Sequence, residues 1–360
     1  MNRYYDYPYS DQWGDAEYLS GNGCFDLEKF KHSETGRDLA AARYMMKEYS
    51  GVDDPALLER WEKIGVRCEV RETAGKRWLA FMPKAAYDAD CAVKYPVMLI
   101  FRPVGLLAEA FYEYMIQQVA QDDFIALIYC AEDPNENDVY VDMLKEIQAQ
   151  FPTDPSRVYV TGHSHYGELC MEFMRRHHEL IAAVAQQGDA PGLLHNFYGL
   201  TDEKLEMMHT WDMPLSIVTG TTEMVGCFPM NTDAPGIPED SRYRKSSFPM
   251  KAADRMDVWQ RRLYGMNCPV CTTEEMLAAA NGNIVNQQLG CPADRTDVFY
   301  AAGSECYLAD FKNNNGKYHF RVVAIENLPH TTSTLMHIVS WSFLRRFARD
   351  LETGAVIERY

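Results

Sequence analysis

The chain has 360 residues, of which 47% are hydrophobic and 12% aromatic. That is enough apolar side chain for a sizeable buried core, and it excludes a disordered protein. The formal net charge is −17 at pH 7, so we expect no nucleic-acid partner and no attraction to an acidic membrane surface.

No stretch of the sequence resembles a membrane span or an export signal. No apolar run reaches the roughly 18 residues that a spanning helix needs, and residues 1–18 lack the basic and then apolar order of a secretory signal. We therefore expect a cytoplasmic protein. Its ten cysteines are scattered along the chain, which in a reducing compartment predicts mostly free thiols.

The chain opens with an acidic stretch that is rich in tyrosine. We expect residues 1–60 to be an N-terminal extension and residues 61–360 to form one large domain. The aromatic run at residues 4–9 is a candidate surface for contact between copies in a homo-oligomer, or for an arm over a pocket. The alternative is aromatic packing on the same chain.

From residue 66 onward, strand and helix patterns alternate. Residues 66–71 and 77–81, around Ala74-Gly75, have the pattern of a hairpin. The alternation predicts an α/β fold with a mostly parallel central sheet, helices on both faces, and ligands at the carboxyl ends of the strands. Further strands are expected at 97–101, 124–130, 157–161, 182–186, 215–219 and 319–325, and helices at 107–121, 138–151, from 168 onward, and at 333–349.

One interval breaks this alternation. About a hundred residues between the last two strands are rich in proline, asparagine, glycine and aromatic residues. We expect residues 224–310 to be a cap-like insertion that precedes the last strand and covers the site.

The most informative motif is DPSRVYVTGHSHYG at residues 154–167. A β-branched and aromatic run stops at Gly162, and Ser164 follows just before a helical pattern. A serine on a sharp turn between a strand and a helix is a nucleophile elbow, which projects the hydroxyl above the sheet. The alternative is that Ser164 only caps the helix. Tyr166 stands where the pattern G-x-S-x-G has its second glycine.

A serine hydroxyl needs a base to remove its proton, and the base needs an acid to orient it. His330 follows the last predicted strand and is the candidate base, while Glu223 follows the strand before the insertion and is the candidate acid. Asp189 and Asp233 are the alternatives for the acid.

The negative charge that forms on a carbonyl under attack needs two N–H donors. The main chain of His165, directly after the serine, would supply one of them. The second would come from the loop after the strand at 97–101. Pro103 in that loop has no N–H, so the candidates are Arg102, Val104 and Gly105. The Arg102 guanidinium and the neighbouring Tyr166 are further candidates for contact with the substrate.

Together these segments resemble the α/β-hydrolase superfamily, and within it the polyhydroxybutyrate-depolymerase and feruloyl/acetylxylan-esterase-like branch. The matching pieces are Tyr95-Pro96, DPSRVYVTGHS, residues 220–223 read as a Gly-Thr-x-Glu turn, and Leu328-Pro329-His330 before the terminal helix. The resemblance implies a serine hydrolase that cleaves a small-molecule or oligomeric carboxylic ester through an acyl-enzyme. It implies Ser164, His330 and Glu223 as the triad, with no cofactor and no metal.

Two other functions fit parts of the same pattern. A serine peptidase of the prolyl-oligopeptidase type shares the order of the triad, but 60 residues cannot form its usual N-terminal propeller. A binding protein that kept the fold and lost the chemistry would account for Tyr166 and Pro103.

The motif Cys268-Pro-Val-Cys271 also suggests a metal or redox site, with Cys291 and Cys306 as further ligands. No second C-x-x-C accompanies it, so we expect no zinc site. In an extracellular setting, a disulfide among these four cysteines would be expected instead.

Overall fold

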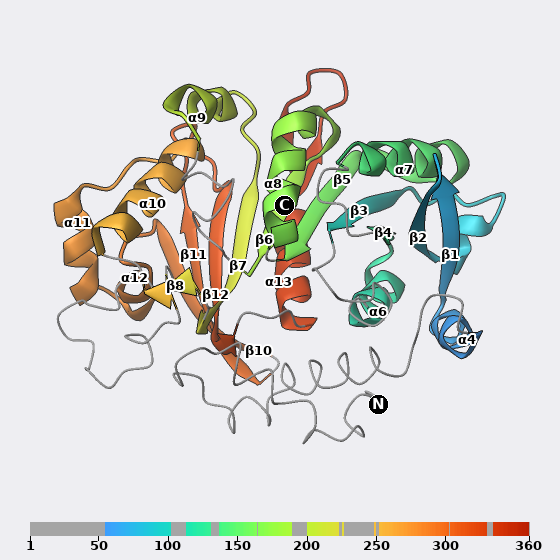
Figure 1. Ribbon diagram of the computed structural model, residues 1–360, viewed down its shortest axis with the longest axis horizontal. Coiled ribbons are helices and arrows are strands. Elements are labelled where there is room, and N and C mark those ends of the chain that lie inside the picture. Colours follow the sequence, from blue (N-terminus) through green and yellow to red (C-terminus); the bar gives the residue numbers. More distant parts are fainter. Residues whose placement is uncertain are drawn as a thin grey trace.

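The structure is a computed structural model, and it describes residues 55–101, 113–130, 137–163, 165–188, 200–222, 225–226, 248–249, 252–301, 303–329 and 334–359. Its central feature is a ten-stranded sheet in the order β1-β2-β4-β3-β5-β6-β7-β12-β11-β10 (Figure 1). The strands are β1 (Val66–Thr73), β2 (Lys76–Pro83), β3 (Tyr95–Phe101), β4 (Ile125–Tyr129), β5 (Thr153–His163), β6 (Ala183–Gln187), β7 (Leu215–Thr222), β10 (Arg295–Ala301), β11 (Ser304–Phe311) and β12 (Phe320–Pro329).

Helices and two small strand pairs complete the described fold. The α-helices are α4 (Pro55–Lys63), α6 (Glu113–Asp122), α7 (Asn137–Gln150), α8 (His165–His177), α9 (Asp202–His209), α10 (Ala252–Gly265), α11 (Thr273–Ala278), α12 (Ile284–Leu289) and α13 (Thr334–Leu344). The short pairs are β8 (Val225–Gly226) with β9 (Phe248–Pro249), and β13 (Phe347–Arg349) with β14 (Val356–Glu358). None of the helices in the described ranges is long and apolar enough to cross a membrane.

The hairpin predicted at the start of the sheet is confirmed. Strands β1 and β2 pair antiparallel, and Thr73 lies opposite Lys76. The two residues between them, Ala74 and Gly75, have φ angles of 52° and 76°. Positive φ at both positions is what a two-residue hairpin turn requires, and it explains the glycine.

The centre of the sheet is parallel. Strands β4, β3, β5, β6, β7 and β12, in this order across the sheet, pair with one another in parallel. All seven residues of β3 are buried, and successive residues face opposite sides, since Leu99 packs in one apolar cluster and Ile100 in another. A strand buried on both faces needs helices on both faces of its sheet.

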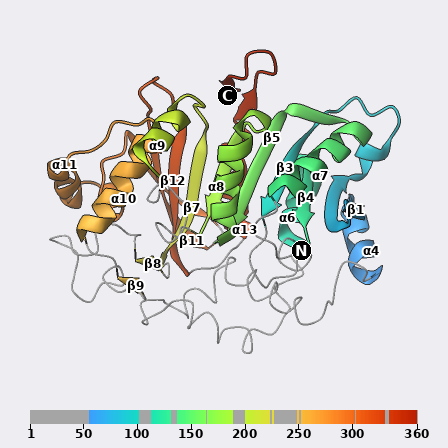
Figure 2. The same cartoon turned by 45° about the horizontal axis from the view of Figure 1, so that its top comes forward.

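The two apolar clusters show which helices cover each face (Figures 1 and 2). Side chains of α7, α8, α9 and α10 join the cluster on one face. Side chains of α4, α6 and α13 join the cluster on the other face. The α/β fold predicted from the sequence, with a mostly parallel sheet between two helical layers, is therefore confirmed.

The end of the predicted insertion differs from the expectation. Strands β10 and β11 extend the central sheet beyond β12, in antiparallel pairing. Helices α10, α11 and α12 lie earlier in the same interval. Strand β10 forms the edge of the sheet and its side chains are mostly exposed, so its sequence carries little of the apolar alternation that identifies a strand.

The terminal helix is shorter than predicted. It ends at Leu344, and β13 begins at Phe347 instead of a further helical turn. The hydroxyl of Tyr159 on β5 donates a hydrogen bond of 2.7 Å to the carbonyl oxygen of Phe347. A bond to a residue nearly two hundred positions away stabilises β13 in a way that local periodicity does not reveal.

Candidate functional site

The predicted nucleophile elbow lies at the junction of β5 and α8. Strand β5 ends at His163, and α8 begins at His165, so Ser164 is the single residue of sequence between them. Ser164 itself lies outside the described residues. A strand that passes into a helix within one residue forms the sharp turn that this motif requires.

Two glycines permit this sharp turn. A Cβ on Gly162 would lie 2.4 Å from the carbonyl oxygen of Tyr166, closer than atoms can approach. A Cβ on Gly167 would lie 3.1 Å from both the Gly162 carbonyl oxygen and Cγ of Gln186 on β6. The first turn of α8 therefore packs directly on the ends of β5 and β6. At Gly162 this contact leaves no room for a Cβ, and at Gly167 a Cβ would force its neighbours to move by a few tenths of an ångström.

This packing explains the departure from G-x-S-x-G. The position of the missing glycine holds Tyr166, which is 5% exposed and belongs to the main apolar cluster. The close contact with the strands is made one residue later, by Gly167. The elbow thus has the spacing G-x-S-x-x-G, and the tyrosine contributes to the core.

The candidate acid and base follow two neighbouring strands. Strand β7 continues to Thr222, and β12 continues to Pro329. Thr222 and Pro329 are partners in the parallel register, so both strands end at one level of the carboxyl edge. Glu223 and His330 are the next residues of the sequence, and both lie outside the described residues.

The predicted Gly-Thr-x-Glu turn at residues 220–223 is wrong over its first three positions, because these residues are part of β7. Between the partner pairs Ile325–Gly220 and Pro329–Thr222, β12 contains two more residues than β7, which is a bulge. A Cβ on Gly220 would lie 1.9 Å from the carbonyl oxygen of Leu328, so glycine is needed where the bulge crosses β7. A bulge at this point redirects the chain just before His330.

The predicted oxyanion loop begins beside the elbow. Phe101, the last residue of β3, is the register partner of Gly162. Arg102, Val104 and Gly105 follow Phe101 in sequence and lie outside the described residues. His165 is the first residue of α8, and the N–H groups at the start of a helix have no intrahelical acceptor. Its main chain is suited to the donor role that the sequence suggests.

Behind the elbow, a buried polar contact joins β6 to α13. The amide nitrogen of Gln187 lies 3.0 Å from Nδ1 of His337 and donates to the hydroxyl of Ser340 at 3.1 Å. All three residues are at most 2% exposed. Burial lowers the pKa of His337 to about 3, so its ring is neutral and accepts the amide proton at Nδ1. Helix α13 directly follows the segment that contains His330.

His163, which precedes Ser164 in the sequence, is buried and packs against the backbone at Gly188. It is 4% exposed, and its Nε2 would lie 2.5 Å from a Cβ on Gly188, whose φ is +62°. Gln187 and Gly188 are not among the site residues that the sequence predicts. Gly188 ends the strand run at 183–187, where a glycine is a common stop signal, whereas the pairing of Gln187 with α13 has no local signature.

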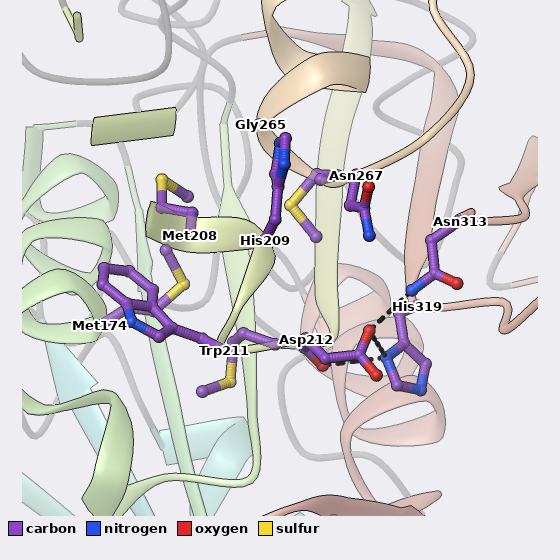
Figure 3. Close-up of a pocket in the computed structure, with 11 residues that line it drawn as sticks. Met174, Met208, His209, Trp211, Asp212, Gly265, Asn267, Asn313 and His319 are labelled. Carbon is purple, nitrogen blue, oxygen red and sulfur yellow. Dashed lines mark hydrogen bonds and ion pairs between the residues drawn. The ribbon is translucent and has the colours of Figure 1, made fainter. Parts of the chain in front are cut away.

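A small cavity lies at the opposite edge of the sheet (Figure 3). Asp212, just before β7, lies beside His319, just before β12, with 3.2 Å between Oδ1 and Nδ1. The cavity has a volume of about 10 Å³, room for one water molecule. An acid–histidine pair without space for a substrate is structural. The other residues that line the cavity include Met174, Met208, Trp211 and Asn313.

No group of three or more potential metal ligands occurs among the described residues. The four-cysteine zinc site considered from the sequence is not formed. Cys268 and Cys291 lie in the cluster on the α8 face of the sheet, whereas Cys306 lies in a cluster with residues of α13 on the other face. The sheet separates these ligands.

No protein-family description and no curated protein sequence matches this chain. Among solved structures, an acetyl xylan esterase from Aspergillus awamori is 9% identical over 77% of this chain and 98% of its own, with a TM-score of 0.48. A feruloyl esterase module from Clostridium thermocellum is 9% identical over 44% and 69%, with a TM-score of 0.37. The S-formylglutathione hydrolase of Staphylococcus aureus is 13% identical over 44% and 80%, with a TM-score of 0.36. Likeness of this degree transfers neither a residue role nor an activity.

Proposed function

We propose that this protein is a serine hydrolase of the α/β-hydrolase type that cleaves a carboxylic ester, with Ser164 as nucleophile, His330 as base and Glu223 as acid. The observation that carries the proposal is the junction of β5 and α8 across one residue, with Gly162 and Gly167 in close contact at its base. A chain that only needed a helix cap would not require two glycines with this packing.

The chain order of the strands supports the same roles. The serine follows β5, the acid follows β7 and the histidine follows β12, and the last two strands end as register partners. This is the order of nucleophile, acid and histidine in α/β-hydrolases. Because all three strands are parallel, their carboxyl ends lie at one edge of the sheet.

In the proposed reaction, His330 takes the proton of the Ser164 hydroxyl as the serine oxygen attacks the ester carbonyl. The tetrahedral intermediate collapses, His330 gives the proton to the departing alcohol, and an acyl-enzyme forms. Water then attacks the acyl carbon with His330 as base, and the serine leaves with the proton. Glu223 orients the imidazole and stabilises its charged form.

Two N–H donors would hold the negative oxygen of the tetrahedral intermediate. One is the main chain of His165 at the start of α8, and the other is Arg102, Val104 or Gly105 in the loop after β3. Phe101 pairs with Gly162, so this loop starts on the strand next to the elbow. We propose that the insertion at 224–310 supplies the surface that selects the acyl and alcohol groups.

The test is hydrolysis of p-nitrophenyl acetate and butyrate by wild type and by Ser164→Ala. We expect the variant to lose release of p-nitrophenol by at least about 10³-fold while its circular dichroism spectrum is unchanged. Ser156→Ala is the matched control, because Ser156 lies on β5 and its hydroxyl only donates to Asp154 at 2.6 Å. The control should keep full activity.

A fluorophosphonate probe separates an enzyme from a binding protein that kept the fold. Only an activated serine reacts with it, so we expect one adduct, which peptide mapping assigns to Ser164. A folded wild-type protein that neither hydrolyses these esters nor takes up the probe would show that the chemistry is absent.

A further inference from the structure

Two cysteines that are distant in sequence meet in the interval between β7 and β12. The sulfur atoms of Cys271 and Cys291 are 3.4 Å apart. Cys271 lies two residues before α11, and Cys291 lies two residues after the end of α12. The two thiols therefore meet at the base of the helical segment 272–290.

Main-chain and side-chain contacts hold both cysteines in place. The amide of Gln260 on α10 donates to the carbonyl oxygen of Cys271 at 3.2 Å. Cys291 follows Gly290, whose left-handed φ of +66° ends α12. Leu289 and Cys291 are at most 2% exposed and belong to the main apolar cluster. The sulfur–sulfur distance is therefore set by packed structure on both sides.

The two thiols differ in accessibility and acidity. Cys271 is partly exposed, whereas Cys291 is fully buried. The hydrogen bond from the Cys291 thiol lowers the pKa of Cys271 below its usual range, although burial and the charges of Glu275 and Asp294 act against this shift. That hydrogen bond, together with burial, raises the pKa of Cys291. Thiolate is the reactive form, so Cys271 is the thiol that reacts first.

We propose that Cys271 and Cys291 are a redox-active dithiol that closes into an intramolecular disulfide. Cys271 is the attacking thiol and Cys291 the resolving thiol. The sulfurs must approach by about 1.4 Å to reach bonding distance, a shift that side-chain rotation and a small backbone adjustment supply. Sequence spacing alone favours a disulfide between Cys268 and Cys271. In the structure, however, the sulfur of Cys268 contacts the Met266 carbonyl oxygen at 3.6 Å.

The oxidant is a low-molecular-weight disulfide. The thiolate of Cys271 attacks one of its sulfur atoms, the disulfide bond breaks, and one small thiolate leaves and takes a proton from solvent. The thiol of Cys291 then loses its proton and attacks the Cys271 sulfur, and the second small thiol leaves. Two protein thiols are oxidised to one disulfide, and one small disulfide is reduced to two thiols.

The covalent bond would join the two ends of the 272–290 segment. A closed loop of this length restricts the unfolded chain, so oxidation stabilises the insertion relative to its reduced form. Reduction by excess dithiol reverses the change. The free energy of unfolding would then depend on the thiol–disulfide redox potential of the surroundings, independently of ester hydrolysis.

The experiment uses the full chain and 2-hydroxyethyl disulfide, which is uncharged and so is not repelled by Glu275 and Asp294. Free thiols are blocked after oxidation, and trypsin then releases residues 263–295, with Cys268, Cys271 and Cys291 in one peptide. We expect the oxidised peptide to carry one blocking group, whereas the reduced peptide carries three, and to be about 2 Da lighter, the mass of two hydrogens, once the blocking groups are subtracted. Cleavage after Glu275 should leave the two halves linked.

Three variants identify the pair. Cys268→Ser should keep the linked halves, and Cys271→Ser should abolish them. Cys291→Ser should retain one mercaptoethanol adduct on Cys271, because the resolving thiol is missing. In wild type, oxidation should raise the melting temperature by about 5 °C, and dithiothreitol should reverse it. The proposal would be overturned if the two halves of the 263–295 peptide separated after oxidation of the wild-type protein, or if they stayed linked in Cys271→Ser.

Discussion

The side-chain amide of Gln187 lies 3.0 Å from Nδ1 of His337, and this contact ties the end of β6 to α13 across the interior. Both ends of the contact adjoin the proposed active site. Gln187 is the register partner of His163, which precedes the serine, and α13 follows the segment with His330. If the proposed function holds, this contact positions the proposed base, His330, relative to the proposed nucleophile, Ser164.

The first prediction follows from this contact. Gln187→Leu removes a buried amide that contacts Nδ1 of His337 and donates to the hydroxyl of Ser340, so we expect the free energy of unfolding to fall by about 2 kcal/mol. If the proposed function holds, kcat should fall several-fold with little change in KM, because alignment is lost and substrate contact is not. Urea unfolding and ester kinetics measure the two effects.

The control for this prediction is Ser342→Ala. Ser342 also lies on α13, but its hydroxyl donates only to Val339 of the same helix, at 2.7 Å. This variant should keep the kcat of wild type. A Gln187→Leu protein that is folded and has unchanged kcat would show that the contact stabilises the fold without positioning the base.

The second prediction concerns Gly188. It combines a left-handed φ of +62° with the ring of His163, whose Nε2 would lie 2.5 Å from an added Cβ. Gly188→Ala should therefore cost about 3 kcal/mol of unfolding free energy, from backbone strain plus a clash with a buried ring. Denaturant titration measures this loss.

Gly316→Ala is the matched control for Gly188→Ala. Gly316 also has a left-handed φ, of +82°, but an added Cβ would meet only the flexible Cε of Lys312, at 3.7 Å. Only the strain term of about 1 kcal/mol remains there. Equal losses in the two variants would mean that His163 moves aside without cost.

The third prediction identifies the acid of the proposed triad. Glu223→Gln keeps the shape of the side chain but removes the charge that orients His330, so we expect kcat to fall by about 10³- to 10⁴-fold. Asp189→Asn and Asp233→Asn test the two alternatives in the same assay, and each should stay within a few-fold of wild type. A larger loss in either of these would transfer the role to that residue.

The fourth prediction concerns pH. Burial acts to raise the pKa of Asp212, but hydrogen bonds and charges from His319 and Lys317 outweigh it and lower the pKa to about 2, from 3.8. Because the folded state holds the proton less tightly than the unfolded state, this carboxylate stabilises the fold above pH 3.8. The contribution is lost as pH falls from about 3.8 to about 2.

The side chain of Asp212 is 17% exposed, so its contacts are only weakly screened. Asp212→Asn should lower the free energy of unfolding at pH 7 by about 2 kcal/mol, and the difference from wild type should disappear near pH 2. Glu59→Gln is the control, since Glu59 pairs with Lys63 at the surface, with 68% of its side chain exposed. That variant should follow wild type at every pH. A constant difference between Asp212→Asn and wild type from pH 7 to 2 would contradict the assignment.

Local pattern alone predicted the parts of the fold that depend on neighbouring residues. The hairpin at Ala74-Gly75, the buried strand β3 and the junction around Ser164 could all be predicted from sequence. In each case the physical cause lies within a few positions of the chain. Positive φ selects glycine, burial on two faces selects a continuous apolar run, and a tight turn selects small residues.

Contacts between segments that are distant in sequence could be identified only from the folded structure. Four such contacts have no local signature: the register of Thr222 with Pro329, the contact of Gln187 with His337, the antiparallel pairing of β10 with β11, and the meeting of Cys271 with Cys291. Each depends on how a strand or helix is placed by packing against partners far away in sequence. The periodicity of a segment specifies which face is buried, while the shape and chemistry of the opposing surface specify the partner.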